Sequence, residues 1–219
     1  MATSPTSTRT PATSRARDVA WRGPDPVRTE AAHVVLGPDR MAARGTSAVA
    51  GHALDWVLTT GPGWVTRRLS VRARGDGWAR RLDLVRSDAG TWSASRRDAT
   101  DGDGEGHGEG HALDVTGLDA ALDCDLALCP VTNTMPVLRH DLVAAARRGG
   151  GPAVDLVMAW VDVPDLTLHV SPQTYTALGP ADGGGALVGF TSGTFAATLD
   201  LDADGLVRHY PGLATRLAG

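Results

Sequence analysis

The feature that most constrains this fold is an alternation of apolar and polar residues with a period of two. In residues 67–74 and 80–86, Leu69, Val71, Ala73, Leu82 and Leu84 are separated by polar or charged residues. Successive side chains of a β-strand point to opposite faces, so this period predicts strands with one buried and one solvated face. Residues 75–77, Gly-Asp-Gly, predict the hairpin connection between them.

The same pattern returns near the end of the chain, in residues 195–202 and 206–210 around an Ala-Asp-Gly turn. Residues 153–170 supply two further apolar runs, and Pro164 between them must sit at a strand end, a bulge or an edge. The fold class predicted is therefore mainly β, with a large antiparallel sheet. Two segments are candidate helices: residues 118–128, whose pattern fits a helix or a strand, and residues 142–148.

The domain organisation follows from composition. Residues 1–18 hold almost nothing apolar and are predicted to be a disordered tail, with a transit peptide as the alternative, whereas residues 19–219 form a single β-rich domain without an internal linker. No apolar run is long enough to span a membrane and no secretory signal is found. With Cys124 and Cys129 interpreted as buried thiols, these features predict a cytoplasmic protein.

Charge and local motifs limit the kinds of partner that this chain is expected to bind. The formal net charge is −4 and the arginines are scattered, so nucleic acid is not expected as a partner. The acidic, Gly-rich segment 101–110 predicts a mobile surface loop. It resembles half of a calcium loop but has Ala112 at the twelfth position, and whether His107 and His111 bind a metal stays open. We expect no cofactor and no metal site.

Sequence motifs for catalysis are missing: the chain has no GxSxG elbow, phosphate-binding loop, dinucleotide fingerprint or HExxH helix. This absence favours binding over catalysis. The informative stretch is residues 122–140, where Asp123 and Asp125 share one side of an extended strand and Asn133 follows in a turn. Carboxylates beside an amide suit sugar hydroxyls. A solvated sheet face with a turn capped by Asn133 is the alternative, and the residues by themselves favour it.

Residues 130–139, PVTNTMPVLR, together with the preceding Asp123-Cys124-Asp125, resemble the signature of the putative glycolipid-binding family, a bacterial domain of unknown function. The order and spacing of other residues extend the resemblance over about residues 19–217. These residues are Trp21, Glu30, Trp64, Arg67, Trp92, Trp160, Gln173, Tyr175, Asp202 and Tyr210. Leu138 departs from the pattern, because the family has an arginine there; recognition of a phosphate or carboxylate would then rest on Arg139 alone.

The resemblance implies a large curved antiparallel sheet wrapped around a single helix, distantly like carriers of lipoproteins and lipids. It also implies a homodimer, an acidic pocket and a role in glycolipid metabolism. We therefore expect non-catalytic binding of an amphipathic, sugar-bearing lipid, with its apolar part on the concave face of the sheet and its head group at an acidic rim. The expected ligand-binding residues are Glu30, Asp123, Asp125, Asn133, Arg139, Gln173, Tyr175 and Tyr210.

Two alternatives remain at this point. The first is a hydrolase that acts on a sugar or lipid ester through paired carboxylates such as Asp123 and Asp125, for which a glycoside would require a separation of roughly 5–10 Å. The second is a dimeric scaffold whose interior is filled by its own side chains and holds no small ligand.

Overall fold

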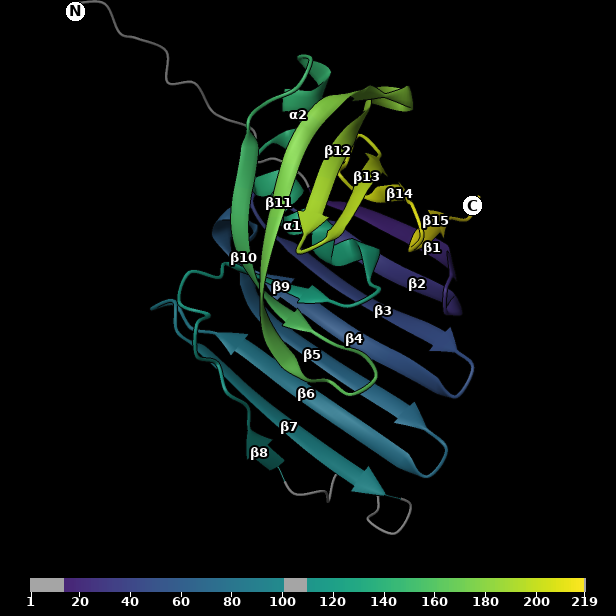
Figure 1. The fold of residues 1–219 in the computed structure, drawn as a ribbon, viewed down its shortest axis with the longest axis vertical. Helices are drawn as coiled ribbons and strands as arrows, with labels where there is room; N and C mark the ends of the chain where they lie inside the picture. The colour runs from purple at the N-terminus through teal and green to yellow at the C-terminus, as the bar shows by residue number, and fades with distance from the viewer. Residues whose placement is uncertain (1–13, 101–109, 219) are drawn as a thin grey trace, which may run out of the picture.

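The structure is a computed structural model that describes residues 14–100 and 110–218. The fifteen strands of these described residues belong to one sheet, in the order β8-β7-β6-β5-β4-β3-β2-β1-β15-β14-β13-β12-β11-β10-β9 (Figure 1). The strands of the first half are β1 (Arg15–Pro24), β2 (Val27–Leu36), β3 (Met41–Val49), β4 (His52–Thr60), β5 (Thr66–Gly75), β6 (Trp78–Arg86), β7 (Trp92–Thr100) and β8 (Gly110–Ala112). The sequence prediction of a mainly β protein with a large antiparallel sheet is confirmed.

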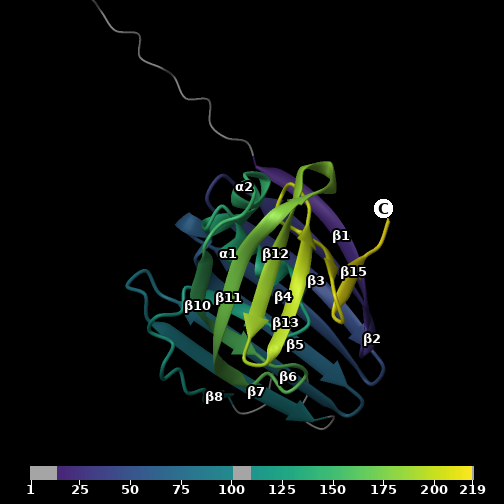
Figure 2. The same ribbon diagram turned by 45° about the horizontal axis from the view of Figure 1, so that its top comes forward.

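The second half of the chain supplies the other side of this sheet. Its strands are β9 (Asp123–Leu126), β10 (Ala153–Val161), β11 (Leu168–Ala181), β12 (Gly185–Ser192), β13 (Phe195–Leu201), β14 (Val207–Tyr210) and β15 (Ala214–Arg216). Pairing of β15 with β1 joins the two halves, and β9 pairs with β10 as a parallel edge strand. The sheet bends so that β11, β12 and β13 lie over the first-half strands (Figure 2).

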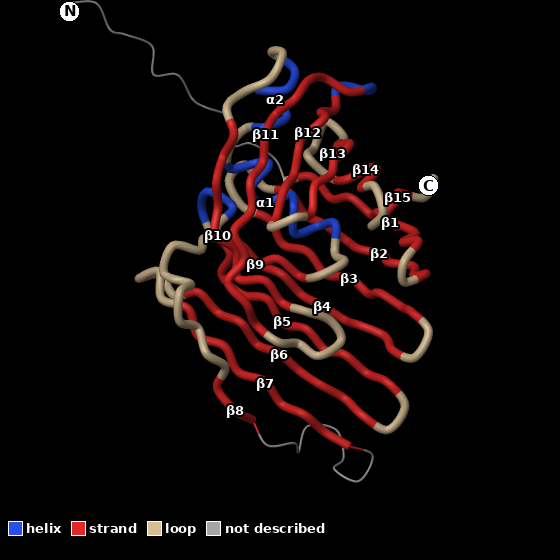
Figure 3. Tube along the Cα trace, in the orientation of Figure 1, coloured by secondary structure: helices blue, strands red, loops and turns tan. Residues whose placement is uncertain are grey.

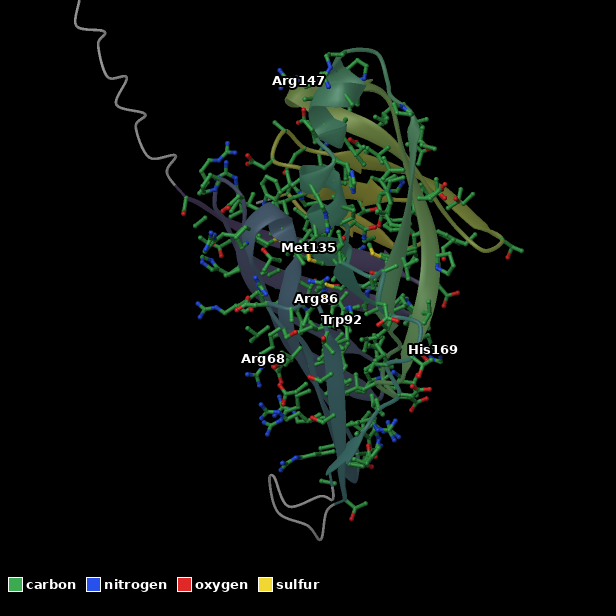
Figure 4. All side chains as sticks on the ribbon, turned by 90° about the vertical axis from the view of Figure 1, so that its left-hand side faces the viewer. Arg68, Arg86, Trp92, Met135, Arg147 and His169 are labelled. Atoms are coloured by element: carbon green, nitrogen blue, oxygen red, sulfur yellow. The ribbon has the colours of Figure 1, made fainter. Side chains whose placement is uncertain are left out.

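The concave face of the sheet encloses the helices, which are drawn in blue among the strands in Figure 3. They are α1 (Thr134–Arg139) and α2 (Leu142–Arg147), with the short turns η1 (Pro62–Trp64), η2 (Pro130–Asn133) and η3 (Asp182–Gly184). Figure 4 shows Met135 of α1 and Trp92 of β7 in the space between the two walls. Both are buried, as are Leu69, Leu82 and Leu126. Protein side chains therefore fill most of the hollow that the sequence analysis assigned to an acyl chain.

Local predictions are largely confirmed. The segments around residues 75–77 and 203–205 are hairpin connections, and Pro164 lies just beyond the end of β10. Residues 142–148 contain α2, whereas the ambiguous segment 118–128 contains the strand β9 rather than a helix. Cys124 and Cys129 are buried free thiols, as expected.

The predicted boundary of the N-terminal tail at residue 18 is wrong, because β1 begins at Arg15. Residues 15–18 are paired with the end of β2 although they carry two arginines and an aspartate. Hydrogen bonds to a neighbouring strand order this polar segment, and composition does not register such bonds. Most of the expected acidic loop, residues 101–109 with His107, lies outside the described residues, whereas Gly110 and His111 belong to β8.

Candidate functional site

A cavity of about 430 Å³ opens between the ends of β9, β10 and β11 and the strands β12, β13 and β14. This volume lies within the range of small-molecule sites, about 300–1,000 Å³. Its lining combines one carboxylate and several amide and hydroxyl groups with four aromatic rings and a histidine. The lining residues are Asp125, Leu126, Ala127, Leu128, Cys129, Asn133, Trp160, His169, Val170, Ser171, Gln173, Phe190, Ser192, Phe195, Tyr210 and Leu213.

Asp125 is the only acidic residue of this lining. It projects from β9, and each of its carboxylate oxygens accepts one hydrogen bond: Oδ1 from the Thr132 hydroxyl at 2.7 Å and Oδ2 from Nε2 of Gln173 at 2.7 Å. Burial raises the pKa of the Asp125 carboxyl above its usual range, while these two hydrogen bonds act in the opposite direction. A carboxylate oxygen has a second acceptor position, so Asp125 can also receive a hydrogen bond from a ligand hydroxyl.

A network of buried amides fixes the floor beside Asp125. The Tyr175 hydroxyl lies 2.9 Å from Oδ1 of Asn133 and 3.2 Å from Oε1 of Gln173, and can donate to either. Tyr175 itself is fully buried behind the cavity wall. Asn133 and Gln173 are therefore held in one orientation by protein contacts, which reduces the entropy lost when they bind a ligand.

Aromatic rings form the wall opposite these polar groups. The ring centroids of Phe190, Phe195 and Tyr210 lie 5.9–6.1 Å apart in pairs, and those of Trp160 and His169 are 5.4 Å apart. Phe195 is 46% exposed and stands at the mouth. An apolar ring face beside hydrogen-bonding groups matches a ligand that is polar on one side and apolar on another.

Glu30 is not at the rim of this cavity. It is 2% exposed on the inner face of β2, with Nε of Arg28 4.0 Å from its carboxylate. Arg28 also donates to the carbonyl oxygen of Leu128 at 2.6 Å, behind the wall that Leu128 and Cys129 form. Glu30 is therefore outside the lining of this cavity, and its expected role as a ligand contact stays a prediction. Its link to the cavity wall runs through Arg28, which contacts both Glu30 and Leu128.

Asp123 and Arg139 are likewise absent from the cavity lining. They form an ion pair with each other, in which Nη2 of Arg139 donates to Oδ2 of Asp123, and their side chains are 1% and 12% exposed. Burial raises the pKa of Asp123 to about 7, although the charge of Arg139 acts in the opposite direction. In this structure the partner of Arg139 is Asp123, and the expectation that Arg139 orients a ligand phosphate or carboxylate stays a prediction.

A scan against protein families finds that residues 18–216 match the model of a family described as "Putative glycolipid-binding". The chain belongs to this family. A solved structure of a DUF1089 family protein from Pseudomonas aeruginosa is similar over 99% of both chains, with 24% sequence identity and a TM-score of 0.59, and this likeness supports the fold alone. A search of curated proteins finds no match.

Of the eight residues that the sequence analysis selected for this glycolipid-binding family member, Asp125, Asn133, Gln173 and Tyr210 line one cavity. Tyr175 supports it from behind through hydrogen bonds. Trp160, His169, Phe190 and Phe195 also line the cavity but were not among the expected residues. His169, Ser171 and Gln173 lie at alternate positions of β11 and therefore share one face. Because Gln173 was already expected at the site, this alternation could also have identified His169 and Ser171.

The paired-carboxylate arrangement proposed for a hydrolase is not formed here. Asp123 and Asp125 both project from β9, but Asp123 is bound to Arg139 and only Asp125 lines the cavity. Glycoside cleavage needs two carboxyl groups that face each other across the substrate. Within the described part of the chain, no three residues of metal-binding type lie close enough to hold an ion, and every helix is too short to cross a membrane.

The buried carboxyl of Glu30 gives a testable dependence of stability on pH. Burial raises its pKa to about 7, whereas its value in an unfolded chain is near 4.3. A group with a raised folded pKa contributes stability at low pH, and this contribution is lost as the pH rises through the folded pKa. Between pH 5 and pH 8, we expect the free energy of unfolding of the wild-type protein to fall by roughly 1–3 kcal/mol relative to that of Glu30→Gln. Urea denaturation of both proteins measures this; a difference independent of pH would contradict it.

Proposed function

We propose that this protein binds an amphipathic, sugar-bearing lipid without catalysis, with the sugar in the cavity around Asp125. The observation that carries the proposal is the composition of the lining: a buried carboxylate and two fixed amides face a wall of aromatic rings. Hydroxyl groups can donate to Asp125 and exchange hydrogen bonds with Asn133 and Gln173. The family description supports a lipid-like ligand.

The charge of the lining favours a neutral head group. Its sixteen residues include one aspartate and one histidine but neither lysine nor arginine. A phosphate or carboxylate would lie beside the Asp125 carboxylate without a cation to compensate it, which is unfavourable in a site removed from water. We therefore infer an uncharged, hydroxyl-rich sugar rather than a phosphorylated one. The acidic group sits inside the cavity wall instead of at an outer rim.

The apolar part of the ligand would leave through the mouth beside Phe195 and Val170, which are 46% and 44% exposed. Each methylene removed from water contributes about 0.8 kcal/mol, so a few carbons held against these side chains outweigh weak head-group contacts. A role in glycolipid metabolism, homodimerisation and a cytoplasmic location stay predictions.

Native mass spectrometry with a neutral glycolipid, monogalactosyldiacylglycerol, and with phosphatidylglycerol tests the proposal. We expect a 1:1 complex with the galactolipid that is weaker or absent with phosphatidylglycerol. Binding of the free sugar alone is expected to be too weak to detect, because the apolar contacts are then missing. Preferential binding of phosphatidylglycerol in the cavity would refute the neutral head group. Binding of neither lipid would refute the proposed function.

Replacement of Phe195 by serine is expected to weaken binding of the galactolipid by roughly five- to twentyfold, since it removes apolar area at the mouth. The folded state should change little, because this ring is half exposed. Leu178→Ser is the matched control: Leu178 is 49% exposed on β11 but does not line the cavity. Equal losses of affinity in the two variants would show that the mouth has no specific role.

A further inference from the structure

A second, smaller cavity lies behind the wall of the cavity around Asp125. Its lining includes Arg28 and Glu30 of β2, neither of which lines the larger cavity. Residues 126–129 line both cavities and therefore form a partition between them. This partition connects Asp125 of β9 to η2, which carries Asn133. Its position therefore affects the distance between two groups that face the ligand.

The backbone of the partition is strained at Leu128. Its φ is 65°, in the left-handed region, where the Cβ of an L-residue lies too close to the backbone. A residue other than glycine keeps this conformation only when its surroundings hold it there, and such positions cluster at functional sites. Backbone hydrogen bonds restrain the neighbouring Ala127 and Cys129. The carbonyl oxygen of Leu128 itself is held by a side chain.

That side chain is Arg28, which approaches from the far side of the partition. Its Nη2 donates to the Leu128 carbonyl oxygen at 2.6 Å, although the two residues are 100 positions apart in the sequence. The Arg28 side chain is 1% exposed, so water does not compete for this hydrogen bond. A charged donor makes the bond roughly twice as strong as a neutral one. Because Nε of Arg28 also lies 4.0 Å from the Glu30 carboxylate, one guanidinium links β2 to the partition.

Space for this guanidinium comes from Gly23 of β1, the cross-strand partner of Arg28. A Cβ at position 23 would overlap Nη1 of Arg28 and lie 2.8 Å from its Cγ, so a larger residue must displace the arginine side chain. The φ of Gly23 is not positive, and its backbone conformation therefore does not require glycine. Glycine at this position serves the placement of Arg28.

Glu30 connects protonation to the partition at two points. Burial raises its pKa to about 7, although a hydrogen bond from the Cys129 thiol and the charge of Arg28 act in the opposite direction. His52 of β4 also lines the small cavity, and burial lowers the pKa of its imidazole. When Glu30 is ionised, its carboxylate attracts both Arg28 and the Cys129 thiol. When Glu30 takes up a proton, both attractions weaken.

We propose that Arg28 is a positioning residue of the cavity around Asp125: it holds the partition in its strained conformation, and ionisation of Glu30 strengthens this hold. The inference rests on the proposed function, which assigns the sugar to this cavity. Arg28 acts through Leu128, whose residue forms part of the cavity lining. Without Arg28, the partition relaxes and Asp125 shifts relative to Asn133. The ligand must then reorder the wall when it binds, which lowers its affinity.

Galactolipid binding to Arg28→Met and Arg208→Met at pH 6 tests the role of Arg28. Most of Glu30 is protonated at this pH, so the first variant leaves little uncompensated charge. Arg208 is a matched control, because it also bonds to a carboxylate, that of Asp200, and to a backbone carbonyl, that of Asp182, away from the cavity. We expect roughly tenfold weaker binding in Arg28→Met and a change within about twofold in Arg208→Met.

The pH profile of binding separates the positioning role from a purely structural one. Between pH 5.5 and pH 8.5, the affinity of the wild-type protein should rise roughly three- to tenfold more than that of Glu30→Gln. Asp123 and Asp125 also have raised pKa values, but they titrate in both proteins, so the comparison isolates Glu30. Parallel profiles would contradict the coupling to Glu30.

Methyl NMR of the free protein tests the same proposal without a ligand. The ¹³C-methyl signals of Leu126, Ala127 and Leu128 should shift with a midpoint near pH 7 in the wild-type protein and lose this shift in Glu30→Gln. They should also move in Arg28→Met and in Gly23→Ala, which displaces the guanidinium without removing its charge, but not in Arg208→Met.

Unchanged partition signals in a folded Arg28→Met, or equal losses of affinity in the two methionine variants, would overturn the proposal. Circular dichroism shows whether each variant is folded. If Arg28→Met is not, Gly23→Ala replaces it in both experiments and should show the same direction of change. If the wild-type protein binds no galactolipid, the proposed function fails, and the NMR signals decide the positioning role of Arg28 by themselves.

Discussion

Asp125→Ala is expected to lower the affinity for a neutral galactolipid by roughly ten- to a hundredfold. Hydrogen bonds to a charged group contribute about 1.5–3 kcal/mol, and Asp125 is the one carboxylate of the cavity. The substitution also leaves the Thr132 hydroxyl and the Gln173 amide without their acceptor, so the floor loses its fixed geometry. Isothermal titration calorimetry or native mass spectrometry measures the loss.

Asp155→Ala is a closely matched control. Asp155 lies on the neighbouring strand β10, where its carboxylate accepts a hydrogen bond from the Thr174 hydroxyl at 2.7 Å, but it does not line the cavity. We expect unchanged affinity in this variant. Asp125→Asn, which keeps the shape of the side chain, should fall between wild type and alanine. Full affinity in Asp125→Ala would mean that the ligand lies elsewhere.

Arg139→Met is expected to reduce the free energy of unfolding by about 3–5 kcal/mol at pH 8, because it leaves the buried Asp123 carboxylate without its cation. The loss should be smaller at pH 5. The pKa of Asp123 is already raised to about 7 beside Arg139, so in the variant this carboxyl is neutral at pH 5 and needs no partner. Chemical denaturation at both pH values measures the difference.

The double variant Asp123→Asn/Arg139→Met separates a structural role from a ligand-binding role. Both charges are then absent, and stability at pH 8 should recover by more than half of the loss. Galactolipid affinity in the double variant should equal that of wild type. Loss of affinity in a stable double variant would return Arg139 to the binding site, as the family resemblance first implied.

The β-sheet fold could be predicted because the alternation of apolar and polar residues that marks a strand lies within a few consecutive residues. Leu69, Val71 and Ala73 alternate with charged residues, and the structure places all three in the core. The turn at residues 75–77 was also clear, since glycine is favoured at the positive φ that Gly77 adopts. The segment 118–128 was ambiguous because a buried edge strand such as β9 lacks a solvated face to set its period.

Half of the expected site residues line one cavity because β9, η2, β11 and β14, which carry Asp125, Asn133, Gln173 and Tyr210, meet there. The other expected residues lie outside its lining, and their side chains contact protein groups. Asp123 and Arg139 are sixteen positions apart in the sequence. No local sequence pattern distinguishes an arginine that binds a ligand from one that pairs with a buried aspartate.

By itself the sequence predicted the strands and turns of residues 67–86 and 195–210 and the family, since each depends on neighbours along the chain. Only the tertiary structure decided that buried side chains fill the hollow of the sheet and that one carboxylate of the pair faces a cavity. Those outcomes depend on contacts between residues distant in sequence. Burial and charge at a point in space are set by several strands together, and period-two alternation within one strand carries no information about them.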